Sequence, residues 1–394
     1  MSREVVILNG VRTPFGKFMG SLSSVSAVQL AAHITKGALQ KSDVAPDQID
    51  HVIFGNVIQS SSDAIYLARH AGLYAGIPKH VPAVTVNRLC GSGLEAITQA
   101  ARMIQNGEAE LVVAGGAENM TQVPFIVRGA RFGLRLGSAK LEDYLWEALL
   151  DPYAGCTMAG TANNVAEKYG ISREEQDEFA LRSQQRAAKA IESGLFKEEI
   201  LPVEIDVKGK KVLFDSDEHP RKDTTREMLA QLPVAPFPGN KFVTAGNASG
   251  INDGAAAVLV ASAEKAKALE IKPLGRIVSW ATAGVEPKLM GLGPAPASLK
   301  ALERAKLSLK NIDLIEINEA FSGQYLGVER ELKLDRDKVN VNGGAIALGH
   351  PLGASGARLT LTLLHELRRQ KKQLGLASLC IGGGQGIAAI VESI

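Results

Sequence analysis

The chain has 394 residues, which is too long for one ordinary hydrophobic core, so we expect two or three domains. Its 44 Lys and Arg residues and 42 Asp and Glu residues leave a formal net charge of +2, which gives no global field for nucleic acid or an anionic membrane. Three cysteines cannot form a disulfide framework, and no apolar run approaches the roughly 20 residues that span a bilayer. A strand pattern starts at Val5 and leaves no room for a signal peptide, so we expect a soluble cytoplasmic protein.

Short apolar runs alternate with helical patterns along both ends of the chain. The run 49–56 is typical of a strand that ends in a polar corner, and residues 94–104 carry apolar side chains at helical spacing before Gly107. Such alternation predicts βαβ units and a largely parallel sheet, and therefore an α/β fold.

Cys90 stands where an apolar run breaks into a turn and the helical pattern begins. A thiol on the first turn of a helix lies at the positive end of the macrodipole, so we expect a lowered thiol pKa and a nucleophile. The small neighbours Gly91, Ser92 and Gly93 would leave room for a substrate carbonyl. The alternative is a buried structural cysteine, as most intracellular cysteines are.

Residues 121–249 interrupt this pattern. A capping box at Ser172 opens a helix that should stop at Gly194, and a polar stretch with several prolines follows. We interpret this segment as an insertion that serves as a lid or binding arm, because such long excursions from a compact domain are usually functional. The first half then resumes as an apolar strand over 253–260.

The two ends of the chain resemble each other. Segment 49–56 matches 312–319, the turn at Cys90 matches that at His350, and the strand before Gly116 matches the one before Gly383. Three matches in order at nearly constant offset indicate duplicated halves, although α/β segments can also be alike by chance. We therefore assign the first half to residues 1–120 and 250–273, the inserted domain to 121–249 and the second half to 274–394.

Polar residues follow the predicted strands of the second half. Asn318 ends one strand, a glycine-dense loop delivers His350 to a helix start, and Cys380 precedes the glycines 382–384. The carboxyl ends of parallel strands line the ligand crevice, so these residues and Cys90 could converge. Taken alone, His350 could be a hydrogen-bonded structural residue and Cys380 a core residue. The glycines after Cys380 fail the dinucleotide fingerprint, and the histidines and cysteines show no metal-ligand spacing, so we expect no metal site.

Together these segments resemble the thiolase family over essentially the whole chain. The matching segments occur in family order and comprise the cysteine loop, an Asn-Glu-Ala-Phe box, a Gly-His-Pro loop and a Cys-x-Gly-Gly-Gly box, at residues 87–93, 318–321, 349–356 and 380–384. Residues 59–70 look like the mitochondrial-matrix type of the family and its bacterial relatives. The resemblance implies a layered αβαβα core of duplicated halves with an inserted loop domain that binds coenzyme A (CoA).

The resemblance also implies a role for each residue. Cys90 would attack the 3-keto carbon of a 3-ketoacyl-CoA, acetyl-CoA would leave, and free CoA would remove the acyl group from the sulfur. His350 would draw the proton from Cys90, and Cys380 would move the proton at the α-carbon of acetyl-CoA. One oxyanion would be held by His350 and a water fixed by Asn318, and the other by the N–H groups of Cys90 and Gly382.

CoA and acyl-CoA are substrates in this reading, with no permanently bound cofactor. The family pattern implies CoA contacts at Arg221 and Thr224 near the nucleotide and at Ser249 near the pantetheine. Three apolar side chains could line the acyl tunnel, although such residues are as often plain core: Met158, Met290 and Phe321.

One departure bears on the substrate. Acetoacetyl-CoA thiolases generally carry a histidine at the position of Thr157, so the sequence favours a broader range of chain lengths. The resemblance implies a place in fatty acid metabolism, including β-oxidation, and the sequence leaves open whether the physiological direction is degradative or biosynthetic. Strict acetoacetyl-CoA specialisation is the first alternative. A ketoacyl synthase and a non-catalytic lipid carrier are remoter ones. As in the family, we expect a homodimer or homotetramer.

Overall fold

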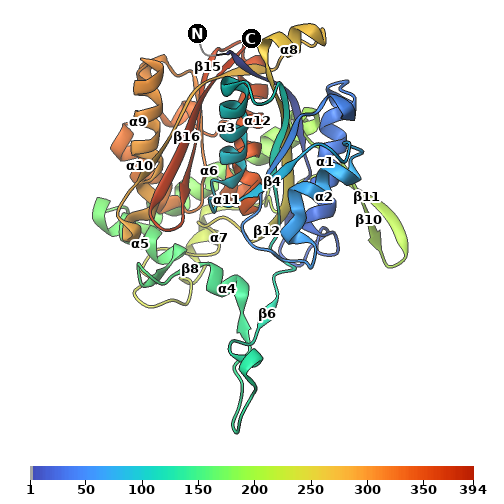
Figure 1. The fold of residues 1–394 in the computed structure, drawn as a ribbon. Helices are drawn as coiled ribbons and strands as arrows, with labels where there is room; N and C mark the ends of the chain where they lie inside the picture. Colours follow the sequence, from blue (N-terminus) through green and yellow to red (C-terminus); the bar gives the residue numbers. More distant parts are fainter. Residues whose placement is uncertain (1–2) are drawn as a thin grey trace.

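The computed structural model describes residues 3–394, and a ten-stranded sheet runs through it (Figure 1). The sheet order is β14-β15-β16-β13-β1-β12-β5-β3-β4, with β2 paired to β12. Its strands are β1 (Val5–Arg12), β2 (Gly16–Lys17), β3 (His51–Gly55), β4 (Ala83–Val86), β5 (Leu111–Asn119), β12 (Asn252–Ser262), β13 (Gly275–Gly284), β14 (Leu314–Ile317), β15 (Leu374–Ile381) and β16 (Gln385–Ser393).

The pairing directions correct the expectation of a largely parallel sheet. In the main sheet within residues 3–394, three strand pairs are parallel: β3 with β4, β3 with β5, and β14 with β15. The other pairs of this sheet are antiparallel. The last strand of each half returns antiparallel to its neighbour. In the second half this return is a tight hairpin, because Gly383 and Gly384 take φ of 77° and 78° between β15 and β16. Too few residues separate these strands for the crossover helix that a parallel pair needs, and this spacing was the available signal in the sequence.

Both halves have the same strand order and the same pairing directions, as the sequence repeat predicts. Towards the boundary between the halves, β3-β5-β12-β1 corresponds to β14-β15-β16-β13, and the first half has β4 as an additional edge strand outside β3. The carboxylate of Asp50 accepts the N–H groups of Glu110 and Leu111 at 2.8 and 3.0 Å. Asp313 accepts those of Gln373 and Leu374 at 3.0 and 2.9 Å, so the repeat extends to single hydrogen bonds.

Helices fill both sides of each half and complete five layers, the αβαβα arrangement expected. The outer helices of the first half pack on β5 and β12, those of the second half pack on β15 and β16, and α3 and α12 lie between the halves (Figure 1). The helices of this core are α1 (Ala27–Lys41), α2 (Leu67–Tyr74), α3 (Ser92–Asn106), α8 (Ala263–Ala268), α9 (Pro294–Ala305), α10 (Ser322–Leu332), α11 (Ala345–Leu348) and α12 (Leu352–Arg369).

Glycines let α3 and α12 meet at their N-termini. A Cβ on Gly93 would lie 2.6 Å from the carbonyl oxygen of Gly353, and one on Gly356 would lie 2.3 Å from the nitrogen of Leu94. These contacts are with backbone atoms, which cannot move aside as a flexible side chain can. The close approach places the residues that precede the two helices, Cys90 and His350, on the same side of the molecule.

The strands of segment 121–249 form separate two-stranded sheets and do not join the main sheet. Helix α6 begins at a capping box on Ser172 and ends before Gly194, as expected. The elements of the segment are β6 (Phe125–Ile126), β7 (Glu142–Asp143), α4 (Tyr144–Ala148), β8 (Leu150–Asp151), β9 (Cys156–Thr157), α5 (Met158–Tyr169), α6 (Arg173–Glu192), β10 (Val203–Val207), β11 (Lys210–Phe214) and α7 (Arg226–Ala230).

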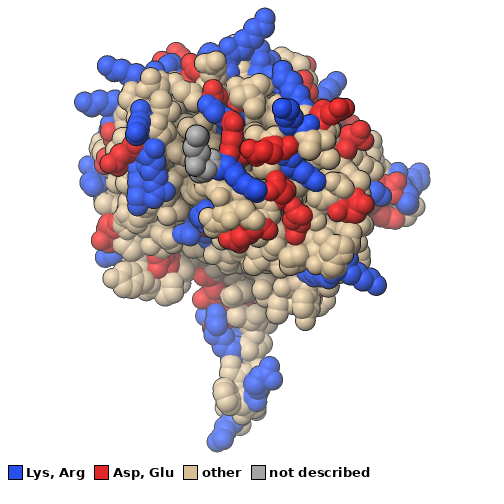
Figure 2. Space-filling view, turned by 45° about the horizontal axis from the view of Figure 1, so that its top comes forward, with Lys and Arg blue, Asp and Glu red and all other residues tan. Residues whose placement is uncertain are grey.

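An arm between β6 and β7 projects far from the body (Figure 1). Its residues include Phe132 and Leu136, which are 89% and 107% exposed. Acidic and basic side chains are interspersed over the face seen in Figure 2, and most of the surface of the arm is neither acidic nor basic. None of the helices within residues 3–394 is both long enough and apolar enough to pass through a membrane.

Candidate active site

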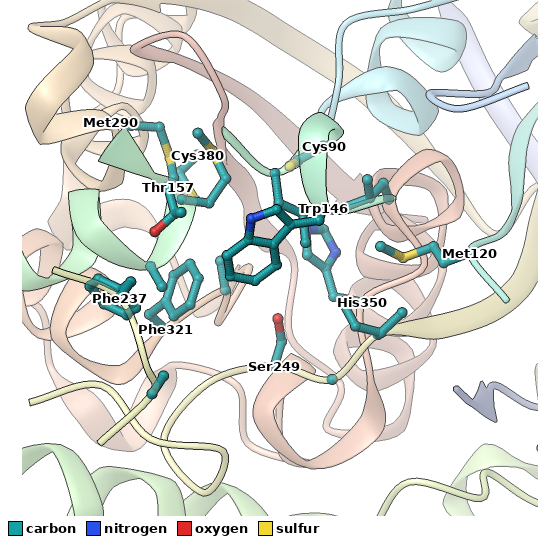
Figure 3. A pocket seen from close by; sticks show the side chains of 18 of the residues that line it. Cys90, Met120, Trp146, Thr157, Phe237, Ser249, Met290, Phe321, His350 and Cys380 are labelled. Atoms are coloured by element: carbon teal, nitrogen blue, oxygen red, sulfur yellow. The ribbon is translucent and has the colours of Figure 1, made fainter. Parts of the chain in front are cut away.

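One cavity of about 240 Å³ lies where the halves meet, and it gathers the residues that the sequence singled out (Figure 3). Cys90, His350 and Cys380 all line it, although they are far apart along the chain. Most of the other lining residues are apolar: Met120, Trp146, Leu149, Thr157, Met158, Ala159, Ala235, Pro236, Phe237, Ser249, Gly250, Ile251, Met290, Ala320, Phe321 and Leu352. The predicted contacts Met158, Met290 and Phe321 and the predicted pantetheine contact Ser249 thus share one space with the two thiols and the imidazole.

A strained turn presents Cys90. Leu89 adopts a left-handed φ of 47°, which costs free energy for a residue with a side chain. Asn87 holds this turn, because its Oδ1 accepts the N–H of Leu89 at 2.9 Å. The hydroxyl of Ser92 accepts the N–H of Arg88 at 2.8 Å and donates to the carbonyl of Leu89 at 2.7 Å.

Two expectations about this turn were wrong. Cys90 lies just before the cap residue of α3 and not in the first turn of the helix, and burial raises its pKa to about 11. The N–H of Gly382 acts in the opposite direction on this pKa, but desolvation is larger. Nor do the glycines leave space for substrate, because a Cβ on Gly91 would lie 2.6 Å from Cδ1 of Ile381.

His350 is buried and held at three points. Its N–H donates to Oδ1 of Asn252 at 3.0 Å, and its Nδ1 lies 2.5 Å from the hydroxyl of Ser355. That hydroxyl donates to the carbonyl of Pro351 at 2.9 Å, so Nδ1 carries the proton and donates to Ser355. Nε2 is therefore the basic nitrogen, and Nδ2 of Asn318 lies 3.2 Å from it.

The ring of His350 is uncharged at neutral pH. Burial lowers its pKa to about 3, and the positive charge of Arg358 acts in the same direction. In this neutral imidazole Nε2 carries no proton, and its lone pair accepts the Nδ2–H of Asn318. When that contact is exchanged, Nε2 can accept a proton from a thiol and, once protonated, hold a developing oxyanion.

Cys380 is the penultimate residue of β15 and is fully buried. Burial raises its pKa, and negative charge on Cys90 acts in the same direction. Both sulfurs lie at the wall of the same cavity (Figure 3). Gly382 follows in the hairpin turn, and its N–H points at the Cys90 sulfur, as its effect on the Cys90 pKa requires.

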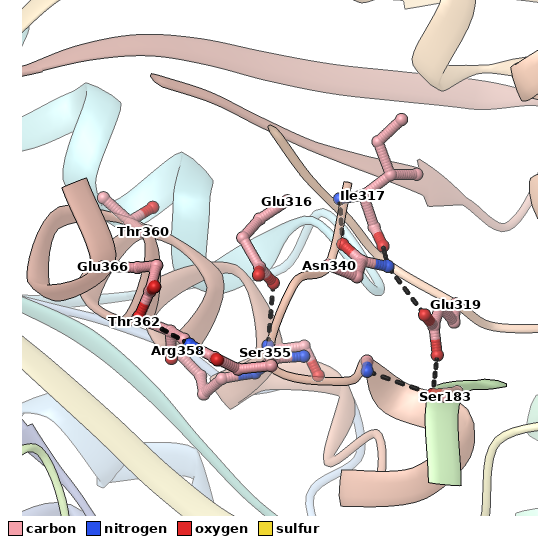
Figure 4. Close-up of polar contacts among 12 residues, drawn as sticks. Ser183, Glu316, Ile317, Glu319, Asn340, Ser355, Arg358, Thr360, Thr362 and Glu366 are labelled. Carbon is pink, nitrogen blue, oxygen red and sulfur yellow. Dashed lines mark hydrogen bonds and ion pairs between the residues drawn. The ribbon is translucent and has the colours of Figure 1, made fainter. Parts of the chain in front are cut away.

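The Asn-Glu-Ala-Phe box starts directly after β14 (Figure 4). Oδ1 of Asn318 has no protein partner within residues 3–394, so it is available to a water molecule. The carboxylate of Glu319 accepts the hydroxyl of Ser183 at 2.6 Å and Nδ2 of Asn340 at 2.8 Å. Glu319 therefore fastens the inserted helix α6 to the loop that leads to His350.

The two residues predicted at the nucleotide end of CoA lie outside the main cavity. Arg221 is exposed and lines a neighbouring cavity of about 530 Å³, which shares its lining residue Ile251 with the first. Arg221 and Thr224 together line a further cavity of about 130 Å³. The hydroxyl of Thr224 donates to the carbonyl of Arg221 at 2.8 Å, so both belong to one turn.

Sequence reasoning missed several lining and supporting residues. Trp146 and Phe237 reach the cavity from the inserted segment, where no periodic pattern marks them (Figure 3). Ser355 could have been found, because it lies in the first turn of α12, close in sequence to His350. Asn252 is the first residue of β12, and nothing in its neighbourhood signals contact with His350. The part of the chain that the structure describes holds no group of three or more metal-ligating side chains.

Comparisons with known proteins agree with this site. The family patterns "Thiolase, N-terminal domain" and "Thiolase, C-terminal domain" match residues 5–264 and 271–393. The human mitochondrial 3-ketoacyl-CoA thiolase is 52% identical over 99% of this chain and 98% of its own sequence. An acetyl-CoA acetyltransferase of Syntrophomonas wolfei is 51% identical over the full length of both chains.

Solved structures agree as well. The crystal structure of the human mitochondrial 3-ketoacyl-CoA thiolase in complex with CoA superimposes with a TM-score of 0.96, covering 100% of this chain and 98% of that chain, at 52% identity. The chain belongs to the thiolase family. It is accordingly an enzyme, an acyltransferase.

Proposed function

We propose that the protein cleaves 3-ketoacyl-CoA with CoA to acetyl-CoA and a shortened acyl-CoA, reversibly, through an acyl thioester on Cys90. The observation that carries this proposal is the meeting of Cys90, His350 and Cys380 in one largely apolar cavity. Two sulfurs and one imidazole are the groups that such an exchange needs, one as nucleophile and two to move protons.

The pKa values define the resting protonation state. With the Cys90 pKa raised to about 11 and the His350 pKa lowered to about 3, the resting pair is a neutral thiol and a neutral imidazole. The proton of Cys90 passes to Nε2 of His350 as the sulfur attacks the 3-keto carbon. When the carbon–carbon bond breaks, the electron pair goes to the α-carbon of acetyl-CoA, which takes its proton from Cys380. Free CoA then donates its thiol proton to Cys380 and displaces the acyl group from Cys90, and the released Cys90 sulfur takes back its proton from Nε2 of His350.

Two groups of donors support the charged intermediates. The protonated Nε2 of His350, with a water on Oδ1 of Asn318, would hold one oxyanion. The backbone N–H groups of Cys90 and Gly382 would hold the other. Each donor of this kind is typically worth about 3 kcal/mol of barrier.

CoA would enter along the inserted segment. Ser249 stands at the wall of the main cavity, Ile251 connects that cavity with the next, and Arg221 and Thr224 lie beyond. This order of residues fits pantetheine at Ser249 and the nucleotide near Arg221. The CoA complex of the human relative supports CoA as a substrate, and we propose no permanently bound cofactor.

For the acyl group we propose a range wider than acetoacetyl-CoA and a degradative role in β-oxidation. Thr157 leaves more room at the cavity wall than a histidine would, and the surrounding side chains are apolar. Relatives under both names are about equally similar, so a strict acetoacetyl-CoA thiolase is the second candidate.

The test has two parts. Intact mass after incubation with acetyl-CoA should show one acetyl adduct, which Cys90→Ala should abolish together with turnover; the Cys156→Ala control, at the third cysteine, should keep both. No adduct on folded protein would contradict the covalent mechanism. Comparing kcat/KM for acetoacetyl-CoA with that for a longer 3-ketoacyl-CoA decides the range, since activity on acetoacetyl-CoA alone would refute the wider one.

We propose further that the protein is a homotetramer in the cytoplasm. The arm between β6 and β7 exposes Phe132, Leu134, Leu136 and Leu141, more apolar surface than a lone loop tip usually carries. A second copy is the occupant that the family implies. The three free cysteines fit a reducing compartment.

A further inference from the structure

Glu118, near the end of β5, is fully buried beneath the active-site cavity and is not used by the chemistry proposed above. Its Oε1 accepts the N–H of Ile58 and Nδ2 of Asn56, both at 3.0 Å. Its Oε2 accepts the N–H of Val57 at 3.0 Å and that of Gly353 at 2.9 Å. All four partners are donors and favour the ionised carboxylate, whereas burial raises the pKa of Glu118 to about 7, so the carboxylate is fully ionised only above neutral pH.

One side of this network leads to the nucleophile. Glu118 fixes Val57, whose carbonyl accepts Nδ2 of Asn87 at 3.0 Å. The same Asn87 side chain accepts the N–H of Leu89 and so holds the left-handed turn before Cys90. The side chains of Glu118 and Asn87 thus connect β5, through the main chain of Val57, with the backbone turn that positions the Cys90 sulfur.

The other side leads to the base. Gly353 is in the first turn of α12, three residues after His350. A negative charge at a helix N-terminus is stabilised by the free N–H groups and by the macrodipole. The N-terminus of α12 therefore acts on Glu118, and one carboxylate joins the two elements that carry nucleophile and base.

We propose that Glu118 is a positioning residue that locks the Cys90 turn to the start of α12. This inference rests on the proposed function for its effect on turnover. The reactivity of the Cys90 thiol is a readout that does not, because the ionised Glu118 carboxylate raises the pKa of Cys90, as a smaller cause than burial, whether or not substrate is present. The other titratable group facing Glu118 is Asp253, which is itself bonded to Thr121.

The decisive variant is Glu118→Gln, which has nearly the same shape. Its amide offers one acceptor atom in place of two, so two of the four donors lose their partner and meet an NH₂ group. We expect kcat for thiolysis to fall about 100-fold, as for a small misplacement of reacting groups, with KM for CoA nearly unchanged. Loss of the charge should move the pH profile of Cys90 alkylation by iodoacetamide to lower pH, measured on the Cys90 peptide by mass spectrometry. Turnover and thiol reactivity thus change in opposite directions.

Two further variants complete the experiment. Glu118→Asp keeps the charge but shortens the reach, so kcat should fall while the alkylation profile stays near that of the wild type. Glu264→Gln removes an exposed charge on α8 and should change neither. Unchanged kcat and alkylation in Glu118→Gln would overturn the proposal. A parallel loss of turnover and of Cys90 alkylation would also overturn the proposal, because it would show that Glu118 acts on folding alone. If the wild type itself catalyses no thiolysis, the proposed function fails, while the alkylation shift still tests the charge effect.

Discussion

Replacing Ser355 with alanine should lower kcat by acting on the tautomer of His350. The Ser355 hydroxyl is the acceptor for Nδ1–H of His350 at 2.5 Å, and it is fully buried. Without it, a buried N–H loses its partner at a cost of about 1–3 kcal/mol. The Nδ1–H tautomer, which leaves Nε2 free to accept the Cys90 proton, is disfavoured by that amount.

At about 1.4 kcal/mol per tenfold change, this cost corresponds to a fall in kcat of about 5- to 150-fold. KM should change little, because Ser355 does not line the cavity. Steady-state thiolysis of acetoacetyl-CoA measures both constants. The matched control is Thr360→Val, which removes another buried α12 hydroxyl that bonds only the carbonyl of Gly356. A kcat loss in Ser355→Ala no larger than in the control would refute the assigned tautomer.

Three further outcomes are expected. Burial lowers the pKa of His350 to about 3 and that of His365 to about 4, so between these values and about 6.5 the unfolded chain binds more protons than the folded protein. The free energy of unfolding, measured by urea denaturation, should therefore decrease as pH falls from 6.5 towards 4, by up to about 1.4 kcal/mol per pH unit for each histidine. The decrease should be less steep in His365→Gln. Gly93→Ala should reduce thermal stability by about 1–3 kcal/mol and reduce kcat. The control Gly284→Ala, whose Cβ would meet nothing nearer than 4.0 Å, should do neither. Equal melting temperatures of the two variants would contradict the close contact between α3 and α12. Leu136→Ser in the arm should lower the mass measured by light scattering, and an unchanged mass would argue against arm-mediated assembly.

Much of the site could be predicted because its residues stand in short segments with strong local signals. Cys90, Asn318, His350 and Cys380 each follow a strand or precede a helix, and the structure brings Cys90, His350 and Cys380 into one cavity, with Asn318 bonded to His350. The roles assigned to these residues stay predictions until the variants are measured.

Other features depended on contacts that no local pattern reveals. The Cys90 pKa was predicted to be lowered because the helix dipole is visible in sequence, whereas the burial that raises it comes from residues of the other half and the insertion. The direction of β16 was missed because the glycines after Cys380 serve as a hairpin turn and not only as amide donors. The limits of the inserted domain likewise stay a prediction.

The position of β1 has a consequence for how the chain folds during synthesis. β1 pairs with β12, so that Val5 lies opposite Ser262, and with β13 through Val6 and Arg276. Both hydrogen-bonding edges of β1 therefore stay unpaired until its partners β12 and β13, within residues 252–284, have been synthesised. Contacts at such sequence separation slow folding and leave unpaired edges exposed, so newly made chains should depend on chaperones more than their final stability would suggest.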